Sequence, residues 1–256
     1  MTKLTIQKRR NQKIIVLLEQ AQDSKGLVII AHGLGGNKDE LQIVTVAEVF
    51  KEKHYTVVCF DATNTFGESD GTYEDATVTS YKEDLENVIT WVKKQSWYRE
   101  PFVLVGHSLG GITTTLYAEE HPKEVKALAP ISAVISGNLS TKTPKYISTR
   151  ANWEKEGWIA EKSSTVPSRI KRLPWSHMVD RLKYDVLPNT NKLTMPVLCI
   201  VGDMDDTTPP EHQKLFYEKL QGRKEMHIIK DASHTFKTPE HLNEIKQIFC
   251  KWIDVI

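Results

Sequence analysis

Short apolar segments alternate along the chain with longer segments in which apolar residues recur every three or four positions. The apolar runs Leu27–Ala31 and Phe102–Val105 have the length of buried strands. Between them, Ser80–Gln95 repeats its apolar residues at the spacing of an amphipathic helix. This alternation predicts an α/β protein in which helices cover a mainly parallel sheet.

The same pattern supplies further elements on either side of these segments. The first two strands flank the polar residues Arg10-Asn11-Gln12 and are expected to form an antiparallel hairpin. Besides the two runs above, the predicted strands are Lys3–Lys8, Lys13–Glu19, Thr56–Phe60, Lys126–Pro130, Pro196–Val201 and Glu225–Ile229. The other predicted helices are Leu41–Lys53, a segment after Ser108, Glu211–Leu220 and a terminal helix that starts near Pro239.

The alternation lapses between Val134 and Met195. This stretch has few continuous apolar runs, several prolines and three of the six tryptophans of the chain. An unstructured loop of this length is unusual in a compact domain, so the segment is expected to be partly helical and functional. The sequence therefore predicts one core domain, formed by residues 1–133 and 196–256, with residues 134–195 inserted over the sheet.

Length and charge exclude several classes of protein. A chain of 256 residues can bury a sizeable core in one domain without disulfides or metals. Lys and Arg total 34 and Asp and Glu total 33, so no global basic field is available to attract nucleic acid or a membrane surface. The cluster Lys8-Arg9-Arg10 is local, and we interpret it as a solvated hairpin turn. Nucleic acid is therefore not an expected partner.

The three cysteines form no C-x-x-C pair, and an odd, sparse count suits a reducing compartment. Cys59 and Cys199 lie in apolar runs and are expected to be buried thiols. The apolar run Ile14–Leu18 is shorter than the roughly 7–15 residues of a signal-peptide core. No run approaches the ~18 apolar residues of a membrane span. We therefore expect a cytoplasmic protein that is not integral to a membrane.

Gly106-His107-Ser108-Leu109-Gly110 is a G-x-S-x-G sequence between a predicted strand and a predicted helix. A strand that turns directly into a helix forces the central residue into a strained backbone conformation, and the flanking glycines leave room for the helix to cross the strand. Such a turn holds the Ser108 hydroxyl at the carboxyl edge of the sheet. The sequence thus predicts that Ser108 is the nucleophile of a serine hydrolase.

A serine hydroxyl needs a neighbouring base to take its proton, and the base needs an acid to orient it. With this type of turn, the order along the chain is Ser, then Asp or Glu, then His. Two later predicted strands lead into suitable loops, Gly202–Pro209 and Lys230–Phe236. Of the nine histidines, His234 alone has both the order and the loop context. On these grounds the acid could be Asp203, Asp205 or Asp206. Asp203 or Asp206 could instead cap the following helix.

Taken with two further segments, these motifs resemble an α/β-hydrolase of the cap-bearing type, which includes feruloyl and cinnamoyl esterases, monoacylglycerol lipases and serine aminopeptidase-like enzymes. The resemblance spans nearly the whole chain. It is carried by His32–Asn37, Phe60-Asp61 with Gly67–Gly71, the Ser108 pentapeptide, the G-x-x-D-x-x-x-P loop from Gly202 and Ala232-Ser233-His234. It implies an α/β-hydrolase fold with a mostly parallel eight-stranded sheet, helices on both faces and an inserted cap, here residues 134–195.

The resemblance also assigns roles to single residues. It implies that Asp205 is the acid of a catalytic triad and that His234 is its general base. One donor to the oxyanion should be the backbone N–H of Leu109, the residue after the nucleophile. The other, by resemblance, is the backbone N–H of Leu34. The alternative for both leucines is that only their side chains matter, as packing groups.

Two more histidines and one loop bear on this assignment. His107 resembles the residue that packs behind the nucleophile in this family, and His32 is expected to brace the loop that carries Leu34. The loop Asp61–Gly67 departs from the compact version usual in the family and is one residue longer. The resemblance therefore does not establish that this loop neighbours the active site.

Substrate choice rests on residues 134–195, which contain no recognisable specificity motif. Trp153, Trp158 and Tyr146, together with Ile147, are candidates for an apolar acyl or aryl pocket. The alternative is that these side chains only pack the inserted segment against the body of the protein.

No cofactor and no metal is expected. Acyl transfer through a serine requires neither. The aspartates at positions 203–206 lack the glycine and terminal glutamate spacing of an EF-hand. Leu34-Gly35-Gly36 lacks the Gly-Lys-Ser/Thr ending of a phosphate loop.

The predicted reaction is hydrolysis of small acyl or aromatic esters, so the expected partner is a small-molecule ester. A monoacylglycerol-type lipase is the nearest alternative. An aminopeptidase-like amidase would need a carboxylate near the nucleophile to hold the substrate's amine. The candidates are Glu154, Glu156 and Glu161, which could equally be exposed residues of a helix face. A non-catalytic ligand receptor is the alternative from another class, and a homodimer is left open.

Overall fold

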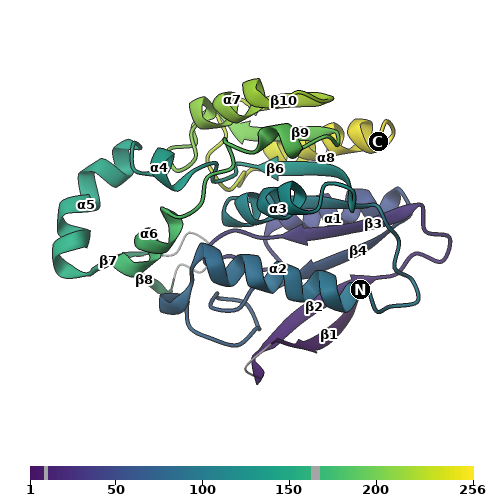
Figure 1. The fold of residues 1–256 in the computed structure, drawn as a ribbon, viewed down its shortest axis with the longest axis horizontal. Coiled ribbons are helices and arrows are strands. Elements are labelled where there is room, and N and C mark those ends of the chain that lie inside the picture. Colours follow the sequence, from purple (N-terminus) through teal and green to yellow (C-terminus); the bar gives the residue numbers. More distant parts are fainter. Residues whose placement is uncertain (9–10, 163–167) are drawn as a thin grey trace.

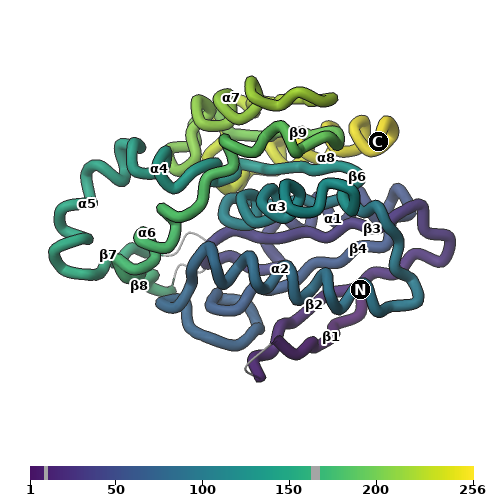
Figure 2. The backbone as a smooth tube through the Cα atoms, in the orientation of Figure 1, coloured from purple at the N-terminus to yellow at the C-terminus, as the bar shows by residue number. Residues whose placement is uncertain are grey.

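The structure, a computed structural model, describes residues 1–8, 11–162 and 168–256. Eight strands form one sheet in the order β1-β2-β4-β3-β5-β6-β9-β10 (Figures 1 and 2). β1 and β2 form the predicted antiparallel hairpin, and the sheet is mainly parallel, as the sequence predicted. The antiparallel pairing of β2 with β4 was not predicted. The strands are β1 (Thr2–Gln7), β2 (Lys13–Glu19), β3 (Gly26–Ala31), β4 (Tyr55–Phe60), β5 (Phe102–His107), β6 (Val125–Ile131), β9 (Val197–Gly202) and β10 (Lys224–Ile229).

Helices cover both faces of this sheet (Figure 1). One face carries α2 (Val78–Val92), α3 (Leu109–Glu120) and α7 (Pro210–Lys219), whose buried side chains join one hydrophobic cluster. The other face carries α1 (Leu41–Glu52) and α8 (Pro239–Ile253), which share a second cluster. The arrangement confirms the predicted α/β-hydrolase fold.

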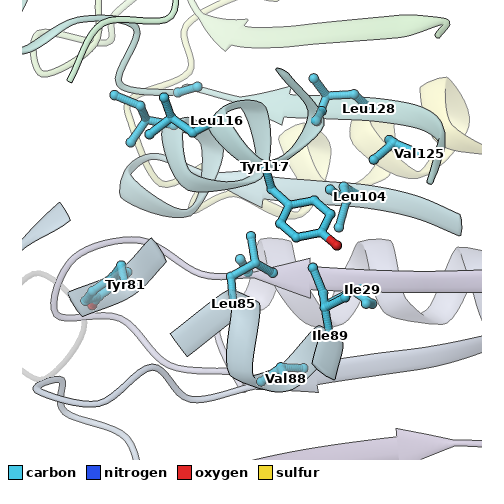
Figure 3. Close-up of a cluster of buried hydrophobic side chains, with 14 of the residues drawn as sticks. Ile29, Tyr81, Leu85, Val88, Ile89, Leu104, Leu116, Tyr117, Val125 and Leu128 are labelled. Carbon is cyan, nitrogen blue, oxygen red and sulfur yellow. The ribbon is translucent and has the colours of Figure 1, made fainter. Parts of the chain in front are cut away.

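The apolar side of α2 is buried against the core, as its amphipathic pattern predicts. Leu85 and Ile89 are buried in the cluster that also contains Tyr117 of α3, and Figure 3 shows both directed toward that ring. Burying one such side chain stabilises the fold by about 1.5–3 kcal/mol. The helix begins at Val78 because Thr77 and Ser80 form a reciprocal capping box, in which the Thr77 side chain accepts a hydrogen bond from the Ser80 N–H.

The winding of the chain reverses at β3, because β3 pairs with β4 on one side and with β5 on the other. In an open parallel sheet, a reversal of this kind leaves a crevice outside the carboxyl ends of the two diverging strands. Leu34 follows β3 and Ser108 follows β5. The fold therefore brings both predicted site segments to the edge of the sheet where a ligand can bind.

Within the inserted segment 134–195, residues 137–162 and 170–181 lie beyond the end of the sheet at which β6 leaves it, and the chain then returns along α3 and α7 to β9 (Figure 1). The segment is partly helical, as predicted, and includes an antiparallel strand pair that its sequence did not indicate. Its elements are α4 (Gly137–Ser140), α5 (Pro144–Glu156), β7 (Trp158–Lys162), β8 (Ile170–Pro174), α6 (Trp175–Arg181) and η3 (Thr190–Lys192). The strand pair escaped prediction because β7 is largely exposed and has no apolar alternation.

The interpretation of Lys8 as a solvated residue is wrong. Its side chain is buried, and its Nζ lies 2.7 Å from Oδ1 of Asp84, a fully buried residue of α2. Asp84 also accepts hydrogen bonds from the N–H and the hydroxyl of Thr63. Lys8 is therefore drawn inward by a buried carboxylate, while Arg9 and Arg10 lie outside the described residues.

Cys59 and Cys199 are buried free thiols, as expected from their apolar surroundings. Within residues 1–8, 11–162 and 168–256, none of the helices combines the length and the apolar character that a membrane span requires.

Candidate active site

Ser108 occupies a sharp turn between β5 and α3. Its φ of +55° lies in a region that non-glycine residues rarely adopt. The turn depends on both neighbouring glycines, because a β-carbon at Gly106 would collide with the Gly110 carbonyl, and one at Gly110 would collide with the Ala31 carbonyl. The strain predicted for this pentapeptide is therefore present, and it holds the hydroxyl at the end of the strand.

Three side chains that are far apart in the sequence meet at this turn. Ser108 Oγ lies 2.9 Å from His234 Nε2, and His234 Nδ1 lies 2.8 Å from Asp205 Oδ2. The loop after β9 carries Asp205 and the loop after β10 carries His234. In this geometry the imidazole can accept the hydroxyl proton on one nitrogen while the carboxylate holds the other nitrogen in place.

Of the three aspartates in the loop after β9, Asp205 alone faces inward. Asp205 is 3% exposed, whereas Asp203 and Asp206 are exposed. Neither of these two caps α7, whose N-cap is Pro209 without a side-chain hydrogen bond. Burial by itself would raise the pKa of the Asp205 carboxyl. The hydrogen bond and charge interaction with His234, together with the Thr208 N–H, nevertheless hold that pKa well below its usual range.

Sequence reasoning missed Thr208. Its N–H donates to Asp205 Oδ1 at 2.8 Å, and its Oγ1 lies 2.9 Å from Asp205 Oδ2 and 3.2 Å from His234 Nδ1. Oγ1 also lies 2.8 Å from the Ser132 carbonyl oxygen, so its one hydrogen is shared between this carbonyl and Asp205 Oδ2. A hydroxyl residue three positions after the acid was visible in the sequence, but its contact with His234 depends on the fold.

His107 lies behind the turn, as the resemblance implied. Its Nε2–H donates to the backbone carbonyl of His234 at 2.9 Å, and the two rings are 5.0 Å apart. Burial lowers the pKa of the His107 imidazole to about 3, so the ring is neutral at physiological pH. A neutral histidine thus fixes the loop of His234 without adding a charge next to it.

The segment after β3 is braced by His32. Its Nδ1–H donates to the Gly33 carbonyl at 2.7 Å, and its Nε2 accepts from the Ala62 N–H at 2.9 Å. The Gly33 carbonyl also accepts a 3.3 Å hydrogen bond from Tyr81. The next N–H is that of Leu34. In the described part of the chain, neither this N–H nor the Leu109 N–H has a protein acceptor, so both remain available to a ligand.

A cavity of about 360 Å³ opens beside Ser108 and His234 and is lined in part by residues 134–195. Leu34, Tyr146 and Trp153 contribute to its wall. The two aromatic side chains are buried and belong to a small apolar cluster with Tyr73 of the body. They therefore line the cavity and also pack the inserted segment against the sheet.

The structure places Trp158 elsewhere. Its side chain is 42% exposed, lies against the guanidinium of Arg172 and does not line the cavity. Successive residues of a strand point to opposite sides, and on β7 it is Ile159, next to Trp158, that reaches the cavity. Ile147 is likewise exposed, because it lies on the side of α5 away from the cavity-lining Tyr146 and Trp153.

Of the three glutamates considered for amine binding, only Glu161 lines the cavity. Its carboxylate is already paired with Lys145 at 3.2 Å. Glu154 pairs with Arg150 on the exposed side of α5, and Glu156 is exposed near the end of that helix.

The loop Asp61–Gly67 is tied to the site region despite its unusual sequence. Asp61 is fully buried and accepts hydrogen bonds from the backbone N–H groups of Lys38 and Glu68, at 2.8 and 2.7 Å. Phe66 stacks on Tyr73 at a ring separation of 4.8 Å, and Tyr73 lines the cavity. The loop thus reaches the cavity through one aromatic contact.

The sequence is similar to one protein family and to several known proteins. The sequence model of the family described as Hydrolase_4, serine aminopeptidase S33, matches residues 22–238. The mitochondrial palmitoyl-protein thioesterase ABHD10 of Mus musculus is 27% identical over 188 residues, which cover 71% of this chain and 59% of that protein. The thermostable monoacylglycerol lipase of Bacillus sp. (strain H-257) is 22% identical over 224 residues, which cover 81% of this chain and 82% of the lipase.

The fold also matches solved structures. Est1E from Butyrivibrio proteoclasticus, solved with bound ferulic acid, superposes with a TM-score of 0.81 at 22% sequence identity, and the match covers 98% of this chain and 97% of that chain. At this identity the likeness shows a shared fold, which agrees with the eight-stranded sheet described above.

Proposed function

On the premise that the chain belongs to the serine aminopeptidase S33 family of α/β-hydrolases, we propose that it hydrolyses carboxylic esters with Ser108 as nucleophile, His234 as general base and Asp205 as the orienting acid. Family membership, together with the thioesterase and lipase relatives, supports an esterase- or lipase-type serine hydrolase. The observation that carries the finer proposal is the continuous chain of contacts, 2.9 Å from Ser108 Oγ to His234 Nε2 and 2.8 Å from His234 Nδ1 to Asp205 Oδ2.

In the first half of the reaction, His234 Nε2 takes the proton of Ser108 as Oγ bonds to the acyl carbon. The carbonyl π electrons move onto oxygen, and the resulting oxyanion accepts hydrogen bonds from the Leu34 and Leu109 N–H groups. Each such donor lowers the barrier by about 2.7–4 kcal/mol. When the carbonyl re-forms, the bond to the alkoxide breaks, and His234 protonates the departing alcohol.

In the second half, water attacks the acyl-enzyme. His234 now accepts a proton from water and then returns it to Ser108 Oγ as the carboxylic acid leaves. Asp205 stabilises the imidazolium in both halves. No cofactor takes part in these steps.

We propose residues 134–195 as a cap over the core formed by residues 1–133 and 196–256, because the cavity beside Ser108 is lined from both parts. A volume of about 360 Å³ lies near the small end of the ~300–1,000 Å³ found for ligand pockets. Together with Tyr146 and Trp153 in its wall, this supports small acyl or aromatic esters as substrates. A cytoplasmic location and a homodimer stay predictions from the sequence.

A monoacylglycerol-type lipase is the second candidate, supported by the Bacillus relative of that name and by the apolar cluster under the cap. The amidase alternative has less support, because Glu161, the candidate carboxylate in the cavity, is engaged by Lys145. A receptor without catalytic activity would not need the Ser108–His234 contact, so this contact supports an enzyme over a receptor.

A substrate panel tests the proposal. Nitrophenyl esters of increasing chain length, aryl esters, a monoacylglycerol and aminoacyl arylamides are assayed with the wild type and with Ser108→Ala. We expect turnover of short or aryl esters that is lost in Ser108→Ala. Faster turnover of arylamides than of every ester would contradict the esterase assignment, and a folded wild type inactive on the whole panel would favour the receptor.

A further inference from the structure

The cavity beside Ser108 carries more positive than negative side chains. Five cationic residues line it, against two carboxylates. The cations are Lys145, Lys162, Lys171, Arg181 and Lys237, and the carboxylates are Glu161 and Asp206. Because the chain as a whole is nearly neutral, this excess is a property of the cavity.

Arg181, the last residue of α6, is held by a neutral partner. Its Nη2 lies 2.8 Å from His177 Nε2, while His177 Nδ1–H donates to the Ala76 carbonyl at 2.7 Å. With its proton on Nδ1, the imidazole accepts from Arg181 through Nε2. Burial lowers the pKa of His177 to about 3, and the nearby Arg181 charge acts in the same direction. His177 therefore orients the guanidinium but leaves its charge uncompensated.

No carboxylate in the described part of the chain forms an ion pair with Arg181. The adjacent Asp180 is turned away, toward Thr79 and Lys183. Arg181 Nε is buried without a hydrogen-bond partner among the described residues. Residues 163–167, outside the described ranges, contain no acidic residue. A guanidinium has five N–H donors, and among the described residues a single one of them has a partner, so donors are left for a ligand.

Lys171 of β8 is a second cationic residue in the wall of the cavity. Its stem passes beside the segment that carries Leu34, since a β-carbon added at Gly35 would lie 3.3 Å from Lys171 Cε. Burial lowers the pKa of its ammonium group, an effect that the carboxylates of Glu161 and Glu40 oppose. Glu161 is shared with Lys145, at 3.2 Å, and no ion pair to Lys171 itself lies within 4 Å among the described residues.

Arg181 and Lys171 are partly buried and line the cavity, and neither forms an ion pair within the described residues. An anion in the cavity would therefore meet charged donors that no carboxylate already occupies, and such charge-assisted hydrogen bonds are strong. We propose that Arg181 and Lys171 bind an anionic group of the substrate, a carboxylate or a phosphoryl group, whose ester bond lies at Ser108. The substrate class is then small esters that carry an anionic group on the acyl side. This inference rests on the proposed function, because it concerns the substrate of the same cavity.

The test compares four 4-nitrophenyl esters that differ at the far end of the acyl chain: pentanoate, hydrogen glutarate, methyl glutarate and 4-phosphonobutanoate. The wild type should have a kcat/KM about 10-fold or more higher for the glutarate or the phosphonate than for the two uncharged esters. A preference for one charged ester over the other identifies which anion the site is built for.

For variants of both cations, the quantity measured is the ratio of kcat/KM for the hydrogen glutarate ester to kcat/KM for the pentanoate ester. Any loss of activity common to both esters cancels in this ratio. Arg181→Gln should lower this ratio about 10-fold, Lys171→Met should lower it several-fold, and Arg181→Lys should retain part of it. Arg150→Gln is the matched control, because Arg150 pairs with Glu154 on the exposed side of α5 and does not line the cavity. Its ratio should equal that of the wild type.

Calorimetric titration with glutarate, and with pentanamide as an uncharged ligand of the same chain length, provides a readout independent of catalysis. The wild type should bind glutarate more tightly, and Arg181→Gln should lose that difference. Ester turnover that depends on Ser108 but shows no preference for a charged chain would overturn this inference and leave the proposed function intact. Absence of turnover with every ester, combined with Arg181-dependent binding of glutarate, would overturn the proposed function and support the anion site.

Discussion

The N–H of Thr208 donates a 2.8 Å hydrogen bond to one carboxylate oxygen of Asp205, and the Thr208 hydroxyl lies 2.9 Å from the other. The same hydroxyl is 3.2 Å from His234 Nδ1. One buried residue therefore fixes the direction of the carboxylate that in turn orients the imidazole. Thr208 acts on the proposed reaction through its neighbours, as a positioning residue.

Thr208→Val, which removes the hydroxyl and keeps the shape, should slow catalysis without weakening substrate binding. A hydrogen bond to a charged group contributes about 1.5–3 kcal/mol, so kcat for ester hydrolysis should fall roughly 10- to 100-fold with little change in KM. Thr208→Ser should restore most of the rate. Thr115→Val is the control, because Thr115 is equally buried and its hydroxyl donates, in the described part of the chain, only to the Gly111 carbonyl of its own helix α3, at 2.8 Å. A similar loss in this control would show that general packing, not positioning, matters.

Asp205→Asn should cost far more activity than the same change at either neighbouring aspartate. Asparagine keeps the size of the side chain but cannot stabilise the imidazolium, and loss of such an acid lowers kcat by about 10⁴-fold in a well-studied serine protease. Asp203→Asn and Asp206→Asn alter exposed side chains, and within the described residues neither carboxylate has a hydrogen bond or ion pair to His234. Steady-state kinetics of the three variants on one ester make the comparison. Equal losses in all three would refute the assignment of Asp205.

Glu119 of α3 should make the folded state less stable as the pH rises. Burial raises the pKa of its carboxyl from 4.5 to about 8, and one of its oxygens has no partner among the described residues. Between these values the folded chain keeps a proton that the unfolded chain has lost. The free energy of unfolding therefore falls with increasing pH, by at most about 1.4 kcal/mol per pH unit from this group.

Urea unfolding of Glu119→Gln between pH 5 and pH 8 checks this expectation. The variant should lose the component of the pH slope that Glu119 contributes and should be more stable than the wild type at pH 8. Glu120→Gln is the control, since Glu120 is an exposed neighbour paired with Lys82 at 2.9 Å. An unchanged slope in Glu119→Gln would mean that this carboxyl ionises normally in the folded protein.

Four central strands, β3, β4, β5 and β9, were predictable because each is buried along its whole length and is mostly apolar, such as Leu27–Ala31 in β3. Ser108 and His234 could be located because their positions are fixed by chain order and by the ends of strands. The same reasoning left three aspartates open for the acid, because distance from a strand end does not tell which carboxylate points inward.

Features that depend on contacts between distant segments could not be predicted. His177 receives its role from the Ala76 carbonyl, 101 positions earlier in the chain. Lys8 is buried because Asp84 draws it inward, although its neighbours in sequence are polar. Trp158 was misplaced because a tryptophan in a stretch without periodicity gives no indication of which side of a strand it occupies.

Covalent labelling shows whether Ser108 is the reactive nucleophile. The folded wild type is treated with a fluorophosphonate probe, and the modified residue is identified by mass spectrometry of its peptides, with Ser108→Ala and His234→Ala in parallel. We expect one adduct, on Ser108, which is absent from Ser108→Ala and forms far more slowly in His234→Ala. An adduct on another serine, or no labelling of the folded wild type, would contradict this assignment.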